Sequence, residues 1–195
     1  MVKTIIRNLK GTQDKGTIFR PSKWFELDLC VDANFCRVFK QQYDRNPDSA
    51  RSRTGHVILL NGCPVLWKSV LQQQISQSTL EVECSALSCA LCTFLPLQRL
   101  LNKMIIMTRC RASEGAMVHA RTFEDNQEAY CYATNHRITN RTKYFLCKRH
   151  LFWEHVDNKE FDVLKCPTDK QRANCLTKAL PKITFKVNRE AVQGW

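Results

Sequence analysis

Carboxylates at three places in the chain have the type and position that phosphodiester hydrolysis with two metal ions requires. Asp32 stands near the end of an alternating stretch, a glutamate follows early in a helical segment, and Asp125 ends a second extended stretch. The two-metal route brings several carboxylates to two cations about 3.5 to 4 Å apart, so that the attacking and leaving oxygens are both stabilised. Each carboxylate alone is weak support, because a solitary acidic residue is usually solvated. Together they form a candidate site for divalent cations.

Two glutamates compete for the helical position, and the phase of the helix separates them. At about 100° per residue, Glu83 falls on the apolar stripe and Glu81 on the polar side. A charge on a buried face is costly unless it is paired or bound to a metal. Glu81 already has a use, because Ser78 and Glu81 form the S-x-x-E pattern of a capping box. We therefore favour Glu83 as the site residue and keep Glu81 as the alternative.

The first half of the chain contains the signals of three consecutive strands. Alternation over 25–32 predicts a strand with its apolar side chains on one face and Asp32 on the other, toward solvent or a cleft. Asn61 and Gly62 stand between two apolar runs, which is the strongest short signal for a β-hairpin. We therefore expect three strands here, paired antiparallel.

The remainder predicts alternating helices and strands. A short amphipathic basic helix ending at Gly11 precedes the first strand. After the hairpin we expect a helix from Ser78 that Pro96 kinks or divides, a strand at 118–124, a helix at 141–156, a strand at 161–165 and a short helix that Thr168 and Gln171 cap and Pro181 ends. This order is α/β, with a five-stranded mixed sheet and helices on both faces.

The charge of the chain favours a polyanionic partner. Thirty Lys and Arg against eighteen Asp and Glu give a net charge of +12, and nucleic acid is the commonest partner of such a surface. A basic surface kept only for solubility is the alternative. Aromatic residues interleave one basic segment, whose candidate nucleic-acid-binding residues are Arg141, Lys143, Lys148 and Arg149. The same segment could instead be the solvated face of a helix.

The eleven cysteines are expected to be reduced thiols, because no signal peptide is recognisable at the N-terminus. Cys89 and Cys92 form a C-x-x-C pair, but no second pair completes a zinc site, so helix packing is the simpler reading. No apolar run reaches the roughly 18 residues of a membrane span. We expect a soluble cytoplasmic or nuclear protein that is not secreted and does not contact a membrane.

Seven ordered pieces of the chain also resemble one protein family. The opening IIRNLKGTQDKGTIF is similar to the stretch that joins reverse transcriptase to ribonuclease H in copia-type retrotransposon polyproteins. The pieces LCVDANF, SRTGHVILLNGCPVLWKS, STLEVECSALS, FEDNQEA, RTKYFLCKRHLFWEHV and QRANCLTKALP resemble, in order, the ribonuclease H domain of that family. The resemblance covers nearly the whole chain.

This resemblance implies a fold, a reaction and a set of site residues. It implies a ribonuclease H-like domain over 21–195, with 1–20 as the tail of the reverse transcriptase connection. The implied reaction is endonucleolytic hydrolysis of the RNA strand of an RNA/DNA hybrid, with two Mg²⁺ ions, or Mn²⁺ in their place. The acidic positions implied for catalysis and metal binding are Asp32, Glu83 and Asp125, and the rest of a reverse transcriptase polyprotein is an implied partner.

The fourth acidic position departs from the family pattern. Family members carry an aspartate in the motif represented by QRANCLTKALP, where this chain has Asn174. An amide oxygen can still bind Mg²⁺ but brings no negative charge, so one metal should bind more weakly. Two other functions therefore stay open: a catalytically impaired nucleic-acid binder, and a transposon remnant with a structural role.

Overall fold

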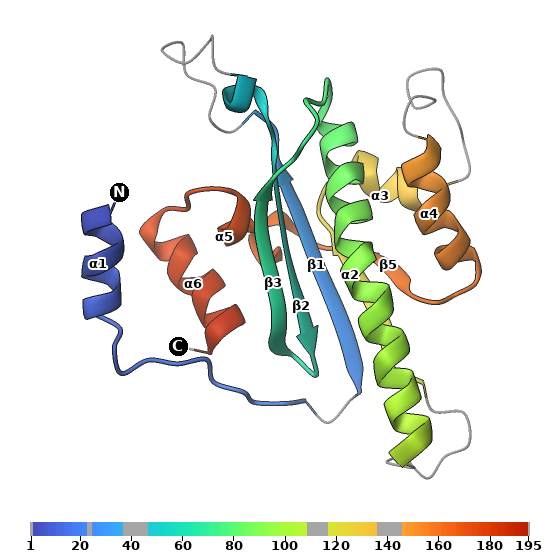
Figure 1. The fold of residues 1–195 in the computed structure, drawn as a ribbon, viewed down its shortest axis with the longest axis horizontal. Coiled ribbons are helices and arrows are strands. Elements are labelled where there is room, and N and C mark those ends of the chain that lie inside the picture. The colour runs from blue at the N-terminus through green and yellow to red at the C-terminus, as the bar shows by residue number, and fades with distance from the viewer. Residues whose placement is uncertain (1, 23–24, 37–46, 109–116, 136–145, 195) are drawn as a thin grey trace.

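A computed structural model of the chain describes residues 2–22, 25–36, 47–108, 117–135 and 146–194. Its centre is a five-stranded sheet with the strand order β3-β2-β1-β4-β5 (Figure 1). The strands are β1 (Glu26–Asn34), β2 (Arg53–Leu60), β3 (Cys63–Leu71), β4 (His119–Glu124) and β5 (Asp162–Lys165). The first three pair antiparallel, whereas β1, β4 and β5 run parallel. The expected mixed sheet with its three antiparallel strands first is confirmed.

The turn between β2 and β3 has the chemistry that the sequence indicated. Asn61 and Gly62 both take positive φ angles, of 53° and 79°, which a two-residue hairpin turn of the primed type requires. The side chain of Asn61 also accepts a hydrogen bond of 3.0 Å from the backbone N–H of Glu26. The predicted hairpin is confirmed, and it is tied to the start of the central strand.

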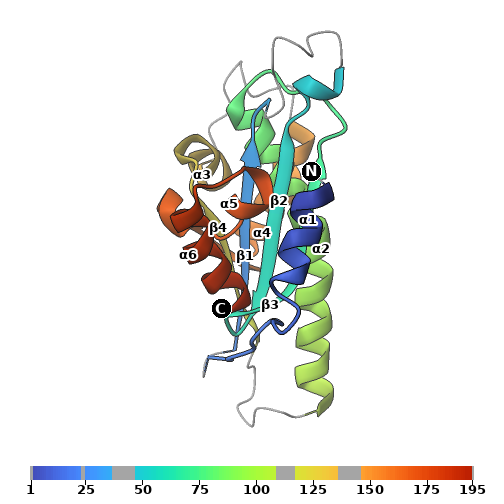
Figure 2. The same ribbon diagram turned by 90° about the vertical axis from the view of Figure 1, so that its left-hand side faces the viewer.

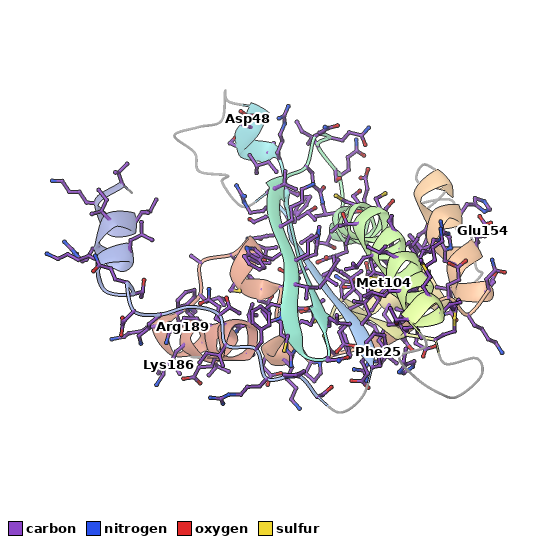
Figure 3. The ribbon with its side chains drawn as sticks, turned by 60° about the horizontal axis from the view of Figure 1, so that its bottom comes forward. Phe25, Asp48, Met104, Glu154, Lys186 and Arg189 are labelled. Carbon is purple, nitrogen blue, oxygen red and sulfur yellow. The ribbon has the colours of Figure 1, made fainter. Side chains whose placement is uncertain are left out.

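Helices cover both faces of the sheet, as expected. One face carries α2 (Thr79–Thr108), α3 (Gln127–Thr134) and α4 (Leu146–Asp157), and the other carries α5 (Asn174–Thr177) and α6 (Lys182–Gln193). From the side of α1 (Val2–Lys10), α5 and α6 lie in front of the sheet and α2 behind it (Figure 2). Lys186 and Arg189 of α6 accordingly lie across the sheet from Met104 of α2 (Figure 3). Helix α1 ends at Lys10, directly before Gly11 as predicted, and lies away from the sheet on the side of α5 and α6.

Each face of the sheet has its own apolar core, which explains why β1 is buried along its length. The larger core lies under α2 and includes Leu27, Leu29 and Val31 of β1. The smaller lies under α5 and includes Cys30 of β1. Because successive strand side chains point to opposite faces, Asp32 belongs to the α5 side.

Helix α2 begins as predicted, but it does not divide at Pro96. Ser78 Oγ accepts a hydrogen bond of 3.2 Å from the N–H of Glu81, while the Glu81 carboxylate accepts from Gln77 rather than from Ser78. Pro96 and Cys92, the residue whose carbonyl loses its partner, are both exposed, so water can satisfy that carbonyl. The helix therefore continues as one element to Thr108.

Helix α2 is also, among the described residues, the one helix long and apolar enough to cross a membrane by length and composition. Half of its most apolar window is buried inside the molecule. A core helix of a soluble protein passes the same test, so this property is weak support for a membrane contact.

The structure contains two helices that the sequence did not lead us to expect. Directly after β4, α3 is capped by Asn126, whose side chain accepts a hydrogen bond from the N–H of Ala129. At the C-terminus, Pro181 does not end a helix but precedes α6 at its N-cap position. Only the part of the predicted 141–156 helix from Leu146 onward lies within the described residues.

The predicted capping box of Thr168 and Gln171 is wrong. Thr168 begins a 3-10 turn that has no side-chain cap. Gln171 is fully buried, and its side-chain amide donates to the backbone carbonyls of Val31 at 2.8 Å and Phe123 at 3.1 Å. The pattern failed because Gln171 bridges β1 and β4, which is a tertiary contact that no local spacing reveals.

Candidate active site

An open pocket at the carboxyl ends of β1 and β4 brings the three predicted carboxylates together. These two strands run parallel, so their carboxyl ends meet at one edge of the sheet, where the N-terminal part of α2 also lies. The pocket is lined by Asp32, Ala33, Glu83, Asp125, Asn126, Gln127, Thr168 and Lys178. Segments far apart in the sequence thus form one acidic site.

Asp32 is held by two partners from the end of α5. The Thr177 hydroxyl donates a hydrogen bond to Oδ2, and Lys178 Nζ lies 3.4 Å from Oδ1. Burial raises the pKa of Asp32, and the charge of Asp125 acts in the same direction, while Thr177 and Lys178 oppose both. The sequence-based argument identified Asp32 but neither of these partners.

A glycine in β2 allows α5 to approach Asp32 so closely. Gly55 is the β2 neighbour of Asp32 in the sheet register. A Cβ on Gly55 would lie 2.7 Å from Thr177 Cγ2 and 2.8 Å from Leu176 Cβ. The absence of a side chain at Gly55 therefore leaves the space that Thr177 needs to reach Asp32.

Glu83 takes the buried position that the helix phase predicted. It is 7% exposed and lines the acidic pocket. The carboxylate of Glu81 instead accepts a hydrogen bond from the backbone N–H of Gln77 at the start of the helix. Burial, followed by the charges of Glu124, Asp32 and Asp125, raises the pKa of Glu83. Its Oε2 atom is buried and has no hydrogen-bond partner among the described residues.

A fourth carboxylate, Glu124, was missed from the sequence. It is 0% exposed, and its Oε1 accepts a hydrogen bond of 3.0 Å from the N–H of Asn126, while its Oε2 is buried without a partner among the described residues. Burial, with the charges of Asp125 and Asp32, raises the pKa of Glu124. Ala120, Thr122 and Glu124 alternate as the buried side chains of β4, so strand periodicity could have revealed it.

Asn174 lies just behind the pocket wall rather than in it. Its side-chain N–H donates a hydrogen bond of 2.6 Å to the carbonyl of Thr168, which does line the pocket. The residue is 4% exposed, and its Oδ1 is buried with no partner among the described residues. The predicted fourth position is therefore adjacent to the acidic pocket but carries no charge.

The described residues contain no group of three His, Cys, Asp or Glu side chains spaced to hold a metal ion. The expectation that three carboxylates share one cation position is therefore not met as the side chains lie. Glu83 comes from α2 on one face of the sheet, whereas Asp32 belongs to the α5 face, where Thr177 and Lys178 occupy its oxygens. The donor set still suits Mg²⁺, because the carboxylate oxygens of Asp32, Glu83 and Asp125 line the pocket as hard ligands, and Oε2 of Glu83 has no hydrogen-bond partner among the described residues.

The predicted nucleic-acid-binding segment is only partly described. Lys148 and Arg149 lie in α4, and Arg141 and Lys143 lie outside the described residues. The role of these four residues therefore stays a prediction.

Comparison with curated proteins gives retrotransposon relatives. No family model matches the chain. It is 28% identical, over 98% of its length, to the retrovirus-related Pol polyprotein from transposon TNT 1-94 of Nicotiana tabacum. It is 23% identical, over 95% of its length, to the corresponding polyprotein from transposon RE2 of Arabidopsis thaliana. Its relatives are Pol polyproteins of copia-type retrotransposons. The chain spans only 13% and 12% of the length of these two polyproteins.

Solved structures give the fold. The LC11 RNase H1 isolated from compost superimposes with a TM-score of 0.53 over 78% of this chain and 92% of that one, at 14% identity. The N-terminal RNase H domain of Rv2228c from Mycobacterium tuberculosis gives a TM-score of 0.50 over 86% and 98%, at 9% identity. The chain therefore has a ribonuclease H-like fold, as the resemblance implied.

Proposed function

We propose that this ribonuclease H-like domain hydrolyses the RNA strand of RNA/DNA hybrids with the help of Mg²⁺. The observation that supports this most directly is the acidic pocket at the carboxyl ends of β1 and β4. Burial, together with the charges of neighbouring carboxylates, raises the pKa of Glu83 in the pocket and of Glu124 beside it, and one oxygen of each has no hydrogen-bond partner among the described residues. Such an arrangement is costly for folding, and a divalent cation would offset the cost.

The residues that would hold the cations are Asp32, Glu83 and Asp125, with Glu124 and Asn174 adjacent to them. When bound, two divalent cations stabilise the charge that develops on the attacking and leaving oxygens of the phosphodiester. Asp32 is positioned for this task by Thr177, whose hydroxyl donates a hydrogen bond to its Oδ2. The net charge of +12 would hold the hybrid backbone around the pocket.

In the wider polyprotein, we expect residues 1–20 to connect this domain to a reverse transcriptase. The match to the plant relatives extends over nearly the whole chain, so it includes this segment. Residue Ile18 already lies against the end of α6, because its N–H donates a hydrogen bond of 2.9 Å to the carbonyl of Gln193.

The neutral amide of Asn174 supports a second candidate, a hybrid-binding domain with impaired turnover. Without a fourth charge, one cation should bind weakly, although the basic surface would still hold the hybrid.

A cleavage assay separates the two. The purified chain is incubated with a labelled RNA/DNA hybrid and Mg²⁺, and Asp32→Asn serves as the matched variant. An enzyme cleaves RNA only in the hybrid and loses at least about 10²-fold in rate on Asp32→Asn, because an electrostatic catalytic group is removed. Binding without cleavage, equal in both proteins, would establish the second candidate instead.

A further inference from the structure

The ammonium group of Lys178 lies in the pocket where the proposed function requires a metal ion. Its ammonium lies 3.4 Å from Oδ1 of Asp32 and lines the same pocket as Asp32, Glu83 and Asp125. The Asp32 side chain is 3% exposed, and Thr177 already occupies its other oxygen. Oδ1 is therefore the oxygen that Asp32 has left to offer a divalent cation, and Lys178 is paired with it.

Thr177 and Lys178, the two hydrogen-bond partners of Asp32, differ in how easily they can move away from its carboxylate. Thr177 is fully buried at the end of α5, under the close contact that Gly55 permits. Lys178 is the residue after the helix, in an extended conformation, and its side chain is 34% exposed. Its ammonium can therefore turn to solvent without moving α5. At 3.4 Å its contact is also longer than a typical charge-assisted hydrogen bond of about 2.7 to 2.9 Å.

We infer that Lys178 is a tethered counter-ion that competes with a divalent cation for Oδ1 of Asp32, so that metal binding must displace it. Lys178 is thus a positioning residue that holds Asp32 in the metal-free protein and sets the metal concentration at which the site fills. This inference rests on the proposed function, because it assumes that the acidic pocket binds the metal.

The competition predicts an unusual direction of change: removing a residue of the site should improve metal binding. Lys178→Met keeps the length of the side chain and removes its charge. The Mg²⁺ concentration at half saturation should fall about three- to tenfold, the range expected for a partly exposed ion pair. Lys178→Arg keeps a charge in place and should stay near the native value. Lys170→Met removes the same charge from an exposed turn outside the pocket and controls for the general electrostatic effect.

Isothermal titration with Mg²⁺ measures the affinity, and the rise in Tm with Mg²⁺ concentration gives an independent value that does not depend on activity. A midpoint that falls for Lys178→Met but not for Lys170→Met supports the inference. Equal midpoints for these two variants, in a native chain that binds Mg²⁺, would overturn the inference and leave the proposed function intact. If the native chain gives neither heat nor a Tm shift with Mg²⁺, the proposed metal site fails, and the inference fails with it.

Discussion

Gly55→Ala should weaken the fold specifically at the contact that positions Asp32. The added Cβ would lie 2.7 Å from Thr177 Cγ2 and 2.8 Å from Leu176 Cβ, so α5 must retreat until these distances reach at least 3.4 Å. Overpacking of this kind costs about 1 to 3 kcal/mol. For a domain of this size, each kcal/mol lowers Tm by about 2 to 4 °C, so we expect a loss of about 2 to 12 °C.

Thermal melting followed by circular dichroism measures this loss, and two further variants identify its cause. Gly16→Ala adds a Cβ that meets nothing within 4 Å, so its Tm should stay near that of the native chain. Thr177→Ser removes the clashing methyl group and keeps the hydroxyl that binds Asp32. The double variant Gly55→Ala with Thr177→Ser should therefore lose less stability than the two single variants together. The packing argument is refuted if Gly55→Ala melts like the native chain, or if the two changes simply add.

Burial raises the pKa of Glu83, and that of Glu124 to about 8, from the ordinary value of 4.5. The folded state then holds protons that the unfolded chain has released, so the free energy of unfolding should fall as the pH rises from 4.5 to 8. Urea denaturation at several pH values measures this free energy of unfolding. For Glu124→Gln the free energy should fall less with rising pH than for the native chain, and an equal pH dependence in both proteins would contradict the burial argument. Asn174→Asp should lower Tm without Mg²⁺, because it adds a buried charge, and it should enlarge the rise in Tm that Mg²⁺ causes. An equal rise in Tm with Mg²⁺ in the variant and the native chain would count against a role of this position in metal binding. Affinity for a hybrid, measured by fluorescence anisotropy, should fall steeply between about 50 and 200 mM salt, whereas a flat response would favour a structural role.

The sequence alone determined much of the sheet and part of the site, because those features follow from local periodicity. The alternation of apolar and polar residues predicted β1 and the face of it that carries Asp32, and Asn61 with Gly62 predicted the hairpin. Helical phase distinguished Glu83 from Glu81, since a residue's position around a helix axis depends only on its neighbours in the chain. The resemblance to copia-type polyproteins then brought Asn174 into the same argument, and it agrees with the observed fold.

The tertiary structure alone decided how the carboxylates are partnered. Thr177 reaches Asp32 across 145 positions of the chain, and Gln171 reaches Val31 across 140. No pattern of spacing encodes such contacts, because they depend on how closely α5 can pack on β2 at Gly55. The complete burial of Glu124 likewise arises only from the packing of helices on that face of the sheet. The sequence therefore located acidic residues at the edge of the sheet, and only the packing of helices on both faces decided which of their oxygens are already bonded and which remain free for a cation.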